Sequence, residues 1–251
     1  MSRRRIFAGN WKMYTTHGEA MALVEGILSG ISGVKDREVI VFPPSPWAKA
    51  VADRCAKTAI AVGMQNMYYE NEGAFTGEVS PAMVKDAGCR YALIGHSERR
   101  HVFGEKDGEV NRKVKAALAH GLEPVLCVGE LLDEREKNLT DEVLARQVNG
   151  ALEGVDAAGM KKVIVAYEPV WAIGTGKVAT PEIADRAHRV IRRLIEERYG
   201  KEIAASLPIL YGGSVKPDNI AGLYAKEEID GVLVGGASLK ADSFLEIIRV
   251  K

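Results

Sequence analysis

The chain has 251 residues, of which 47% are hydrophobic and 27% charged, values ordinary for a globular protein with one large domain or two small ones. Its 34 basic and 34 acidic side chains give a formal net charge of zero, which argues against nucleic acid or an anionic membrane surface as the main partner. Three scattered cysteines argue against a disulfide framework or a zinc site, and no apolar stretch approaches the roughly 18 residues that span a bilayer, so we expect a cytoplasmic protein without a metal.

Short apolar runs rich in β-branched side chains recur about every thirty residues, which is the pattern of buried strands. The predicted strands are residues 6–10, 38–42, 59–64, 91–95, 124–128, 163–167, 209–211 and 231–234. Amphipathic helical patterns lie between them, for example at residues 18–29, 107–120, 142–152 and 182–199. Ser80 and Thr180 are each followed by proline, which predicts that a helix starts at both places.

Strands that are apolar on both faces and alternate with helices predict a parallel sheet covered by helices. Eight such units in 251 residues predict the α/β class and a closed (β/α)₈ barrel, with residues 1–251 forming one domain. An open doubly wound sheet is the alternative. No G-x-G-x-x-G motif follows the first predicted strand, and no change in composition divides the chain into halves.

In such a barrel the chemistry lies at the C-terminal ends of the strands. The first strand ends at Asn10, and Lys12 follows, where its ammonium group could enter the barrel mouth or lie on the surface. His96 follows the fourth strand, just before Ser97, which could cap a helical turn. The positive end of a helix disfavours the charged form of a histidine, so His96 would act as a neutral donor, unless it is a purely structural residue.

The stretch YEPVWAIGTGKVA at residues 167–179 follows the sixth strand and is the most informative in the chain. Glu168 stands at the end of the strand, and the proline after it holds it in an extended conformation. We interpret the stretch as a base on a rigid strand end followed by a lid, with a surface loop and a solvated glutamate as the alternative. The lid residues are Pro169, Val170, Trp171, Ala172, Ile173, Gly174, Thr175, Gly176, Lys177, Val178 and Ala179.

Two glycine pairs end the seventh and eighth strands, and each leads toward a helix. Gly212-Gly213 precedes Ser214, and Gly235-Gly236 follows the last strand. Backbone N–H groups in such positions form a phosphate cradle, although glycine also serves tight turns. Cys127, near the end of the fifth strand, has no neighbour in sequence that would activate it, and we assign it a packing role.

The loop at residues 65–79 is fifteen residues long, which exceeds the usual connection and predicts a functional or interface role. Met67, Tyr68, Tyr69 and Phe75 would be costly to leave in water. We expect them to dock on a partner subunit, with packing against the rim of their own barrel as the alternative.

Five motifs occur in a specific order along the chain: Asn10-Trp11-Lys12, IGHSERR at 94–100, the stretch at 167–179, YGGSV at 211–215 and VGGASL at 234–239. In these motifs, from Phe7 through Leu239, the chain resembles the triosephosphate isomerase family. The resemblance implies a TIM barrel. It also implies cofactor-free interconversion of dihydroxyacetone phosphate and D-glyceraldehyde 3-phosphate by proton transfer through an enediolate, a step of glycolysis and gluconeogenesis.

The resemblance also assigns roles to residues. Glu168 would be the base, neutral His96 would polarise the carbonyl, Lys12 would stabilise negative charge, and Asn10 would position the substrate oxygens. The phosphate would be bound by Gly174, Ser214, Gly235 and Gly236, together with Asn10 and Lys12. Ser97, Glu98 and Cys127 would support the site.

The same resemblance implies a homodimer, in which Thr76 and Phe75 of the 65–79 loop reach toward the partner's Asn10 and the partner's Lys12. Two alternatives stay open at this point. The protein could be another phosphosugar isomerase or epimerase on the same barrel, or a barrel retained as a non-catalytic scaffold.

Overall fold

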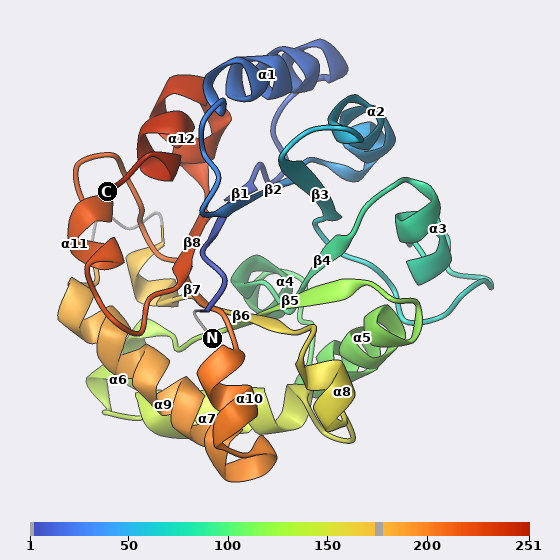
Figure 1. Ribbon diagram of the computed structural model, residues 1–251. Coiled ribbons are helices and arrows are strands. Elements are labelled where there is room, and N and C mark those ends of the chain that lie inside the picture. Colours follow the sequence, from blue (N-terminus) through green and yellow to red (C-terminus); the bar gives the residue numbers. More distant parts are fainter. Residues whose placement is uncertain (1–2, 174–177) are drawn as a thin grey trace.

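The computed structural model describes residues 3–173 and 178–251, and its centre is a closed barrel of eight parallel strands in sequence order (Figure 1). The strands are β1 (Ile6–Asn10), β2 (Glu38–Phe42), β3 (Ile60–Met64), β4 (Tyr91–Ile94), β5 (Glu123–Val128), β6 (Ile164–Tyr167), β7 (Ile209–Tyr211) and β8 (Gly231–Val234). The predicted (β/α)₈ barrel is confirmed, and the predicted strand bounds differ by one residue at most. The strand β4 stops one residue early because Gly95 has a φ of 71°, which breaks the extended backbone.

The barrel closes where β1 pairs with β8 on one side and with β2 on the other. Ile6 lies opposite Glu38 in β2 and opposite Gly231 in β8. The Gly231 backbone has a φ of 151°, and a Cβ there would lie only 1.8 Å from the Ile6 carbonyl oxygen. The seam between the first and last strands therefore requires glycine at position 231.

Alternate side chains of each strand point into the barrel and out toward the helices, so the strands are buried on both faces. The interior cluster consists of Ile6, Ala8, Ile40, Phe42, Tyr91, Leu93, Val125, Cys127, Ile164, Ala166, Leu210 and Leu233. A larger apolar cluster fills the space between strands and helices. These two layers make the strand ends rigid supports for polar side chains.

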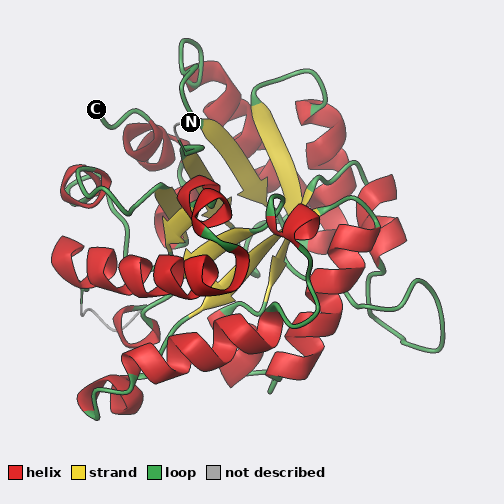
Figure 2. Cartoon of the chain, turned by 60° about the horizontal axis from the view of Figure 1, so that its bottom comes forward, coloured by secondary structure: helices red, strands yellow, loops and turns green. Residues whose placement is uncertain are grey.

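The helices surround the strands (Figure 2). They are α1 (His17–Gly30), α2 (Ser45–Cys55), α3 (Pro81–Asp86), α4 (Ser97–His101), α5 (Asp107–Ala119), α6 (Leu132–Glu136), α7 (Thr140–Ala151), α8 (Ala157–Met160), α9 (Pro181–Tyr199), α10 (Lys201–Ser206), α11 (Ile220–Tyr224) and α12 (Ala241–Ile248), with 3₁₀ turns η1 (Val170–Ala172) and η2 (Gly236–Leu239). The predicted helix starts are confirmed, because the Ser80 and Thr180 hydroxyls accept from backbone N–H groups of α3 and α9. Across the described ranges, no helix is long and apolar enough to cross a membrane.

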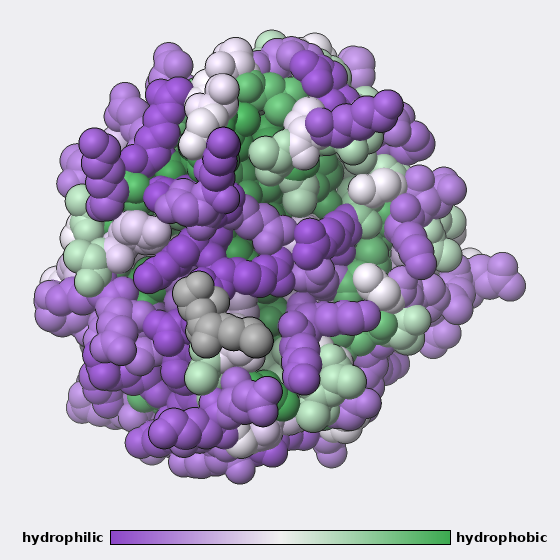
Figure 3. Space-filling view, in the orientation of Figure 1, coloured by the Kyte–Doolittle hydropathy of each residue, from purple (hydrophilic) through white to green (hydrophobic). Residues whose placement is uncertain are grey.

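Ion pairs close the N-terminal end of the barrel, where hydrophilic side chains cover most of the face around the chain's N-terminus (Figure 3). Arg4 donates to Glu38 at 2.6 Å and to Glu123 at 2.9 Å, which links β1 to β2 and β5. The opposite, C-terminal end of the strands is thereby left as the open mouth of the barrel.

Candidate active site

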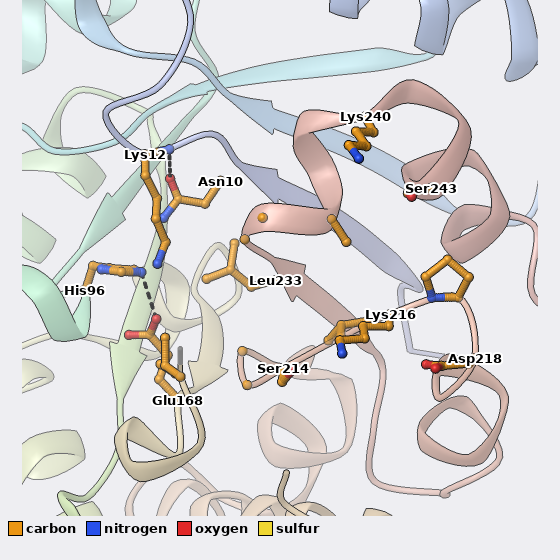
Figure 4. Close-up of a pocket in the computed structure, with 18 residues that line it drawn as sticks. Asn10, Lys12, His96, Glu168, Ser214, Lys216, Asp218, Leu233, Lys240 and Ser243 are labelled. Carbon is orange, nitrogen blue, oxygen red and sulfur yellow. Dashed lines mark hydrogen bonds and ion pairs between the residues drawn. The ribbon is translucent and has the colours of Figure 1, made fainter. Parts of the chain in front are cut away.

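A pocket of about 610 Å³ opens at the C-terminal ends of the strands (Figure 4). It gathers seven residues that the sequence singled out from five separate strand ends. They are Asn10, Lys12, His96, Glu168, Ser214, Gly235 and Gly236. Asn10, His96 and Glu168 are almost fully buried, with 5%, 6% and 2% of their surface exposed. Water therefore has little access to the polar groups at the inner end of the pocket.

Glu168 is held at the end of β6 by two contacts to its carboxylate. His96 Nε2 lies 2.9 Å from Oε1, and the Ser97 N–H donates to Oε2 at 2.9 Å. Two glycines make room for Glu168. A Cβ on Gly129 would lie 1.8 Å from the Glu168 carbonyl oxygen, and one on Gly212 would lie 2.9 Å from its Cγ. Glu168 is thus placed by the His96 side chain and by neighbouring backbone rather than by solvent.

His96 precedes α4, and the Glu98 N–H donates to its Nδ1 at 3.3 Å. A ring that accepts at Nδ1 carries its proton on Nε2, which then faces Glu168 as a donor. A neutral His96 held this way would donate from Nε2; the neutral donor expected from the sequence stays a prediction.

The contact between His96 and Glu168 shifts the pKa of both side chains. For His96 the shift is opposite to the one that the helix end alone would cause. Burial disfavours the charged form of His96, but the charge and hydrogen bond of Glu168 outweigh it, so the pKa of His96 is raised. Burial likewise opposes ionisation of Glu168, but His96 outweighs it and lowers the pKa of Glu168. From the sequence we expected the charged form of His96 to be disfavoured. That expectation did not take the neighbouring Glu168 carboxylate into account, and it does not hold while the two side chains are in contact.

Lys12 reaches the pocket edge in an unusual backbone conformation, with a φ of 52°. Its ammonium group lies 2.6 Å from Glu98 Oε1. The Asn10 side chain accepts from the Lys12 N–H at 3.0 Å, and the Gln65 amide donates to the Lys12 carbonyl at 2.7 Å. A left-handed conformation in a non-glycine residue costs about 1–3 kcal/mol and persists only where surrounding contacts fix it. Asn10 and Gln65 supply those contacts.

Both glycine pairs, Gly212-Gly213 and Gly235-Gly236, line the same pocket as His96 and Glu168; their predicted role as a phosphate cradle stays a prediction. A Cβ on Gly235 would lie 3.5 Å from Lys12 Cε, so the cradle and the ammonium group are neighbours. A Cβ on Gly213 would lie 2.2 Å from the Tyr211 hydroxyl oxygen, so only glycine fits there. Space around Gly236 is open, which leaves its backbone accessible to a ligand.

The start of the lid is anchored to a residue that the sequence reasoning missed. Glu130 is fully buried, and its carboxylate accepts from the Trp171 Nε1–H at 2.8 Å and from the Tyr167 hydroxyl at 3.0 Å. Arg135 lies 3.5 Å from Glu130, and its guanidinium stands 4.4 Å from the Trp171 ring centroid. The signal was available, because Glu130 follows the fifth strand as Glu168 follows the sixth. Gly174, Thr175, Gly176 and Lys177 lie outside the described residues.

Arg100 and Cys127 support the site from behind. Arg100, whose side chain is 7% exposed, donates to the Gly95 carbonyl at 2.8 Å and to Asp107 at 2.6 Å. It therefore fixes the turn that carries His96, a role the sequence reasoning did not assign. Cys127 is fully buried, and burial, then the charge of Glu168, raises the pKa of its thiol well above the ordinary value, which agrees with packing.

The long loop at residues 65–79 projects from the barrel beside α3 (Figure 1). The expectation that Met67 docks on a partner is wrong, because its side chain is fully buried in the core of its own chain. Tyr68 stacks on Tyr69 at 4.0 Å between ring centroids and contacts Phe75 at 4.5 Å. Phe75 remains 39% exposed, and Thr76 is exposed at the loop tip. Only the outer part of the loop is thus free to meet another molecule.

A buried carboxylate, an imidazole and an ammonium group converge on one pocket that two glycine pairs also line. On a (β/α)₈ barrel this combination defines an acid–base enzyme of the class that acts on small phosphorylated substrates. Among the described residues, no group of histidine, cysteine or acidic side chains is arranged to hold a metal ion.

Comparison with known proteins narrows this class. A sequence model of the family described as triosephosphate isomerase matches residues 5–251. The chain is 53% identical to the triosephosphate isomerase of Syntrophotalea carbinolica over 249 residues, which are 99% of each chain. It is 55% identical to that of Chloroflexus aurantiacus over 244 residues, or 97% of this chain and 98% of the relative. The protein belongs to the triosephosphate isomerase family.

Proposed function

We propose that this protein interconverts dihydroxyacetone phosphate and D-glyceraldehyde 3-phosphate, and that residues 1–251 form one catalytic domain. The observation that carries the proposal is the contact between His96 Nε2 and Glu168 Oε1 at 2.9 Å, at the inner end of a pocket with a glycine cradle on its other side. A three-carbon phosphate has its reactive carbons at one end and its anion at the other. The pocket offers Glu168 and His96 to the reactive carbons, and Ser214, Gly235 and Gly236 to the anion.

Glu168 acts as the base. Its carboxylate removes a proton from the carbon next to the carbonyl, the electrons of the broken C–H bond form the carbon–carbon double bond of an enediolate, and the same proton returns to the neighbouring carbon. The carbonyl oxygen becomes negative in this step. The His96 Nε2–H gives its proton to that oxygen and recovers one from the neighbouring hydroxyl, whose oxygen becomes the new carbonyl when the neighbouring carbon is protonated. The Lys12 ammonium stabilises the negative charge of the enediolate.

Substrate entry has to separate the groups that now touch one another. The Glu168 carboxylate is occupied by the Ser97 N–H and by His96, so a substrate carbon reaches it only when these contacts open. Moving Glu168 away from His96 removes the charge coupling between them. The imidazole is then neutral, held so by the Glu98 N–H at Nδ1, and serves as a donor rather than a cation.

The phosphate end of the substrate is assigned to backbone N–H groups of Ser214, Gly235 and Gly236. Open space at Gly236 and the proximity of Gly235 to Lys12 support this placement. Gly174 of the lid is expected to complete the cradle. Asn10 contributes by holding Lys12 and by offering its amide to the substrate oxygens.

We further propose a cytoplasmic homodimer that uses the loop at residues 65–79, with Phe75 and Thr76 at the contact. Supporting this, several large apolar side chains are exposed: Met13, Tyr14, Phe75, Met83, Val102 and Phe103. Large exposed apolar patches typically mark interaction surfaces. Light scattering coupled to gel filtration tests the proposal, and a monomer at micromolar concentration contradicts it.

An assay coupled to dehydrogenases tests the activity in both directions. We expect turnover of both triose phosphates by the wild-type protein and its loss in Glu168→Gln, which keeps the shape of the side chain but removes its basicity. Folding of the variant is checked by circular dichroism. Absence of turnover in the correctly folded wild type contradicts the proposed function and favours a scaffold role.

A further inference from the structure

The pocket extends beyond the groups that a triose phosphate needs. Its volume of about 610 Å³ is typical of sites for drug-sized ligands, whereas a three-carbon phosphate is much smaller. Past the glycine cradle, the lining continues with Lys216, Asp218, Lys240 and Ser243. These four side chains lie on the side of the pocket away from His96 and Glu168 (Figure 4).

Two ammonium groups dominate this outer part of the pocket. Lys216 follows β7 and Lys240 precedes α12, so they come from neighbouring strand ends. Within residues 3–173 and 178–251, neither ammonium group has a hydrogen-bond or ion-pair partner. Lys49, Lys113 and Lys226 each have a carboxylate within 2.7 Å instead. Asp218 is the one carboxylate among the described side chains that line this outer part, so two ammonium groups and one carboxylate leave the local charge positive.

We infer that the outer part of the pocket, lined by Lys216 and Lys240, forms a second anion-binding subsite, and that it admits a small bisphosphate with one phosphate at the proposed cradle and the other beside these ammonium groups. The inference rests on the proposed phosphate site. Unpaired ammonium groups on a concave surface bind a multiply charged oxyanion as point charges, with Ser243 as a further hydrogen-bond donor. A bisphosphate held this way occupies the substrate pocket and acts as a competitive inhibitor.

Alkane-α,ω-diol bisphosphates with three to six carbons, each compared with the alkyl monophosphate of the same length, test the subsite. Inhibition constants from the isomerase assay and dissociation constants from calorimetry are measured at constant ionic strength. At one chain length or more, we expect the bisphosphate to bind at least about tenfold more tightly than its monophosphate. In Lys216→Gln/Lys240→Gln this advantage should fall below about threefold.

A matched variant separates a local subsite from overall charge. Lys57→Gln/Lys201→Gln removes the same charge from exposed positions outside the pocket lining and should leave the bisphosphate advantage unchanged. Asp218→Asn removes the opposing carboxylate and should increase the advantage. Thermal unfolding is measured for every variant, including the two single lysine variants. It shows that the comparison is made between folded proteins.

Three results overturn the inference: equal affinity for bisphosphates and monophosphates in the wild type, an advantage that survives in the double lysine variant, or an equal loss of affinity for both ligand types. The last result means that the lysines only attract the phosphate in the cradle. Calorimetry needs no turnover, so a protein without isomerase activity contradicts the proposed function without deciding the subsite.

Discussion

The indole of Trp171 donates to the carboxylate of Glu130 at 2.8 Å, across 41 residues of sequence. This contact ties the first turn of the lid to the loop after β5. The same carboxylate accepts from the hydroxyl of Tyr167, the residue just before Glu168. Glu130 therefore holds both the strand end that carries Glu168 and the segment that follows it.

Substitution of Glu130 tests this anchoring role. In Glu130→Ala, the buried Trp171 and Tyr167 donors lose their acceptor, which should lower the free energy of unfolding by about 1–3 kcal/mol. We also expect kcat/KM to fall about tenfold, because a loosely held lid samples the closed state less often. Steady-state kinetics and urea unfolding measure the two effects. Glu130→Gln keeps an acceptor and should lose less of both; equal activity in the alanine variant contradicts the role.

Retracting the carboxylate of Glu168 by one methylene should spoil the geometry of proton transfer while preserving its charge. Glu168→Asp is expected to fold normally and to lose at least about 100-fold in kcat, because a displacement of about 1 Å costs a factor of that order. The coupled assay measures it. Glu136→Asp, at an exposed position in α6, is the control and should keep full activity. Unchanged turnover in Glu168→Asp removes this residue from the mechanism.

His188 makes the stability of the fold sensitive to acid. The ring is fully buried, its Nδ1 lies 2.9 Å from the Glu228 carbonyl, and its Nε2 has no hydrogen-bond partner among the described residues. Burial lowers the pKa of His188 from 6.5 to about 4. Between these two pH values His188 is protonated in the unfolded chain and neutral in the folded chain. The free energy of unfolding therefore decreases as pH falls from about 6.5 toward 4.

The expected size of this effect follows from the shift in pKa. At pH 5 the wild type should be about 2 kcal/mol less stable than at pH 7 from this residue alone. His188→Asn retains a donor for the Glu228 carbonyl but does not titrate, so the variant should lack this part of the pH dependence. Urea unfolding at both pH values gives the comparison. Parallel pH profiles for the two proteins would show that His188 is not the cause.

Arg192 is expected to be the most sensitive position in the buried ion-pair network. It donates to Asp230 at 3.1 Å and to the Leu207 carbonyl at 3.0 Å, and it also contacts Glu228. Asp230 is completely buried and keeps Arg3 as an ion-pair partner at 2.5 Å, so Arg192→Met removes part of its compensation and should cost about 3 kcal/mol. Arg189→Met removes an exposed ion pair from the same helix and should cost at most about 1 kcal/mol. Similar losses in both variants contradict this reasoning.

Local sequence signals were sufficient for the strands and for the residues at their ends. Apolar runs, glycine pairs and polar residues just past each strand are adjacent in sequence, and the barrel rule places them at one mouth. Glu130 and Arg192 were missed because their roles come from partners that are distant in sequence, such as Trp171 for Glu130 and Asp230 for Arg192. Met67 was misplaced because an apolar residue in a loop carries no sign of whether its own chain or another covers it.

The seam between β1 and β8 has a consequence for how this chain folds during synthesis. Ile6 is synthesised well before Gly231, its register partner in β8. Until the final strand emerges, β1 has one edge with unpaired N–H and C=O groups, a surface that templates aggregation in other chains. The barrel therefore cannot close before β8 is synthesised, and truncation before residue 231 should leave an aggregation-prone chain rather than a smaller native protein.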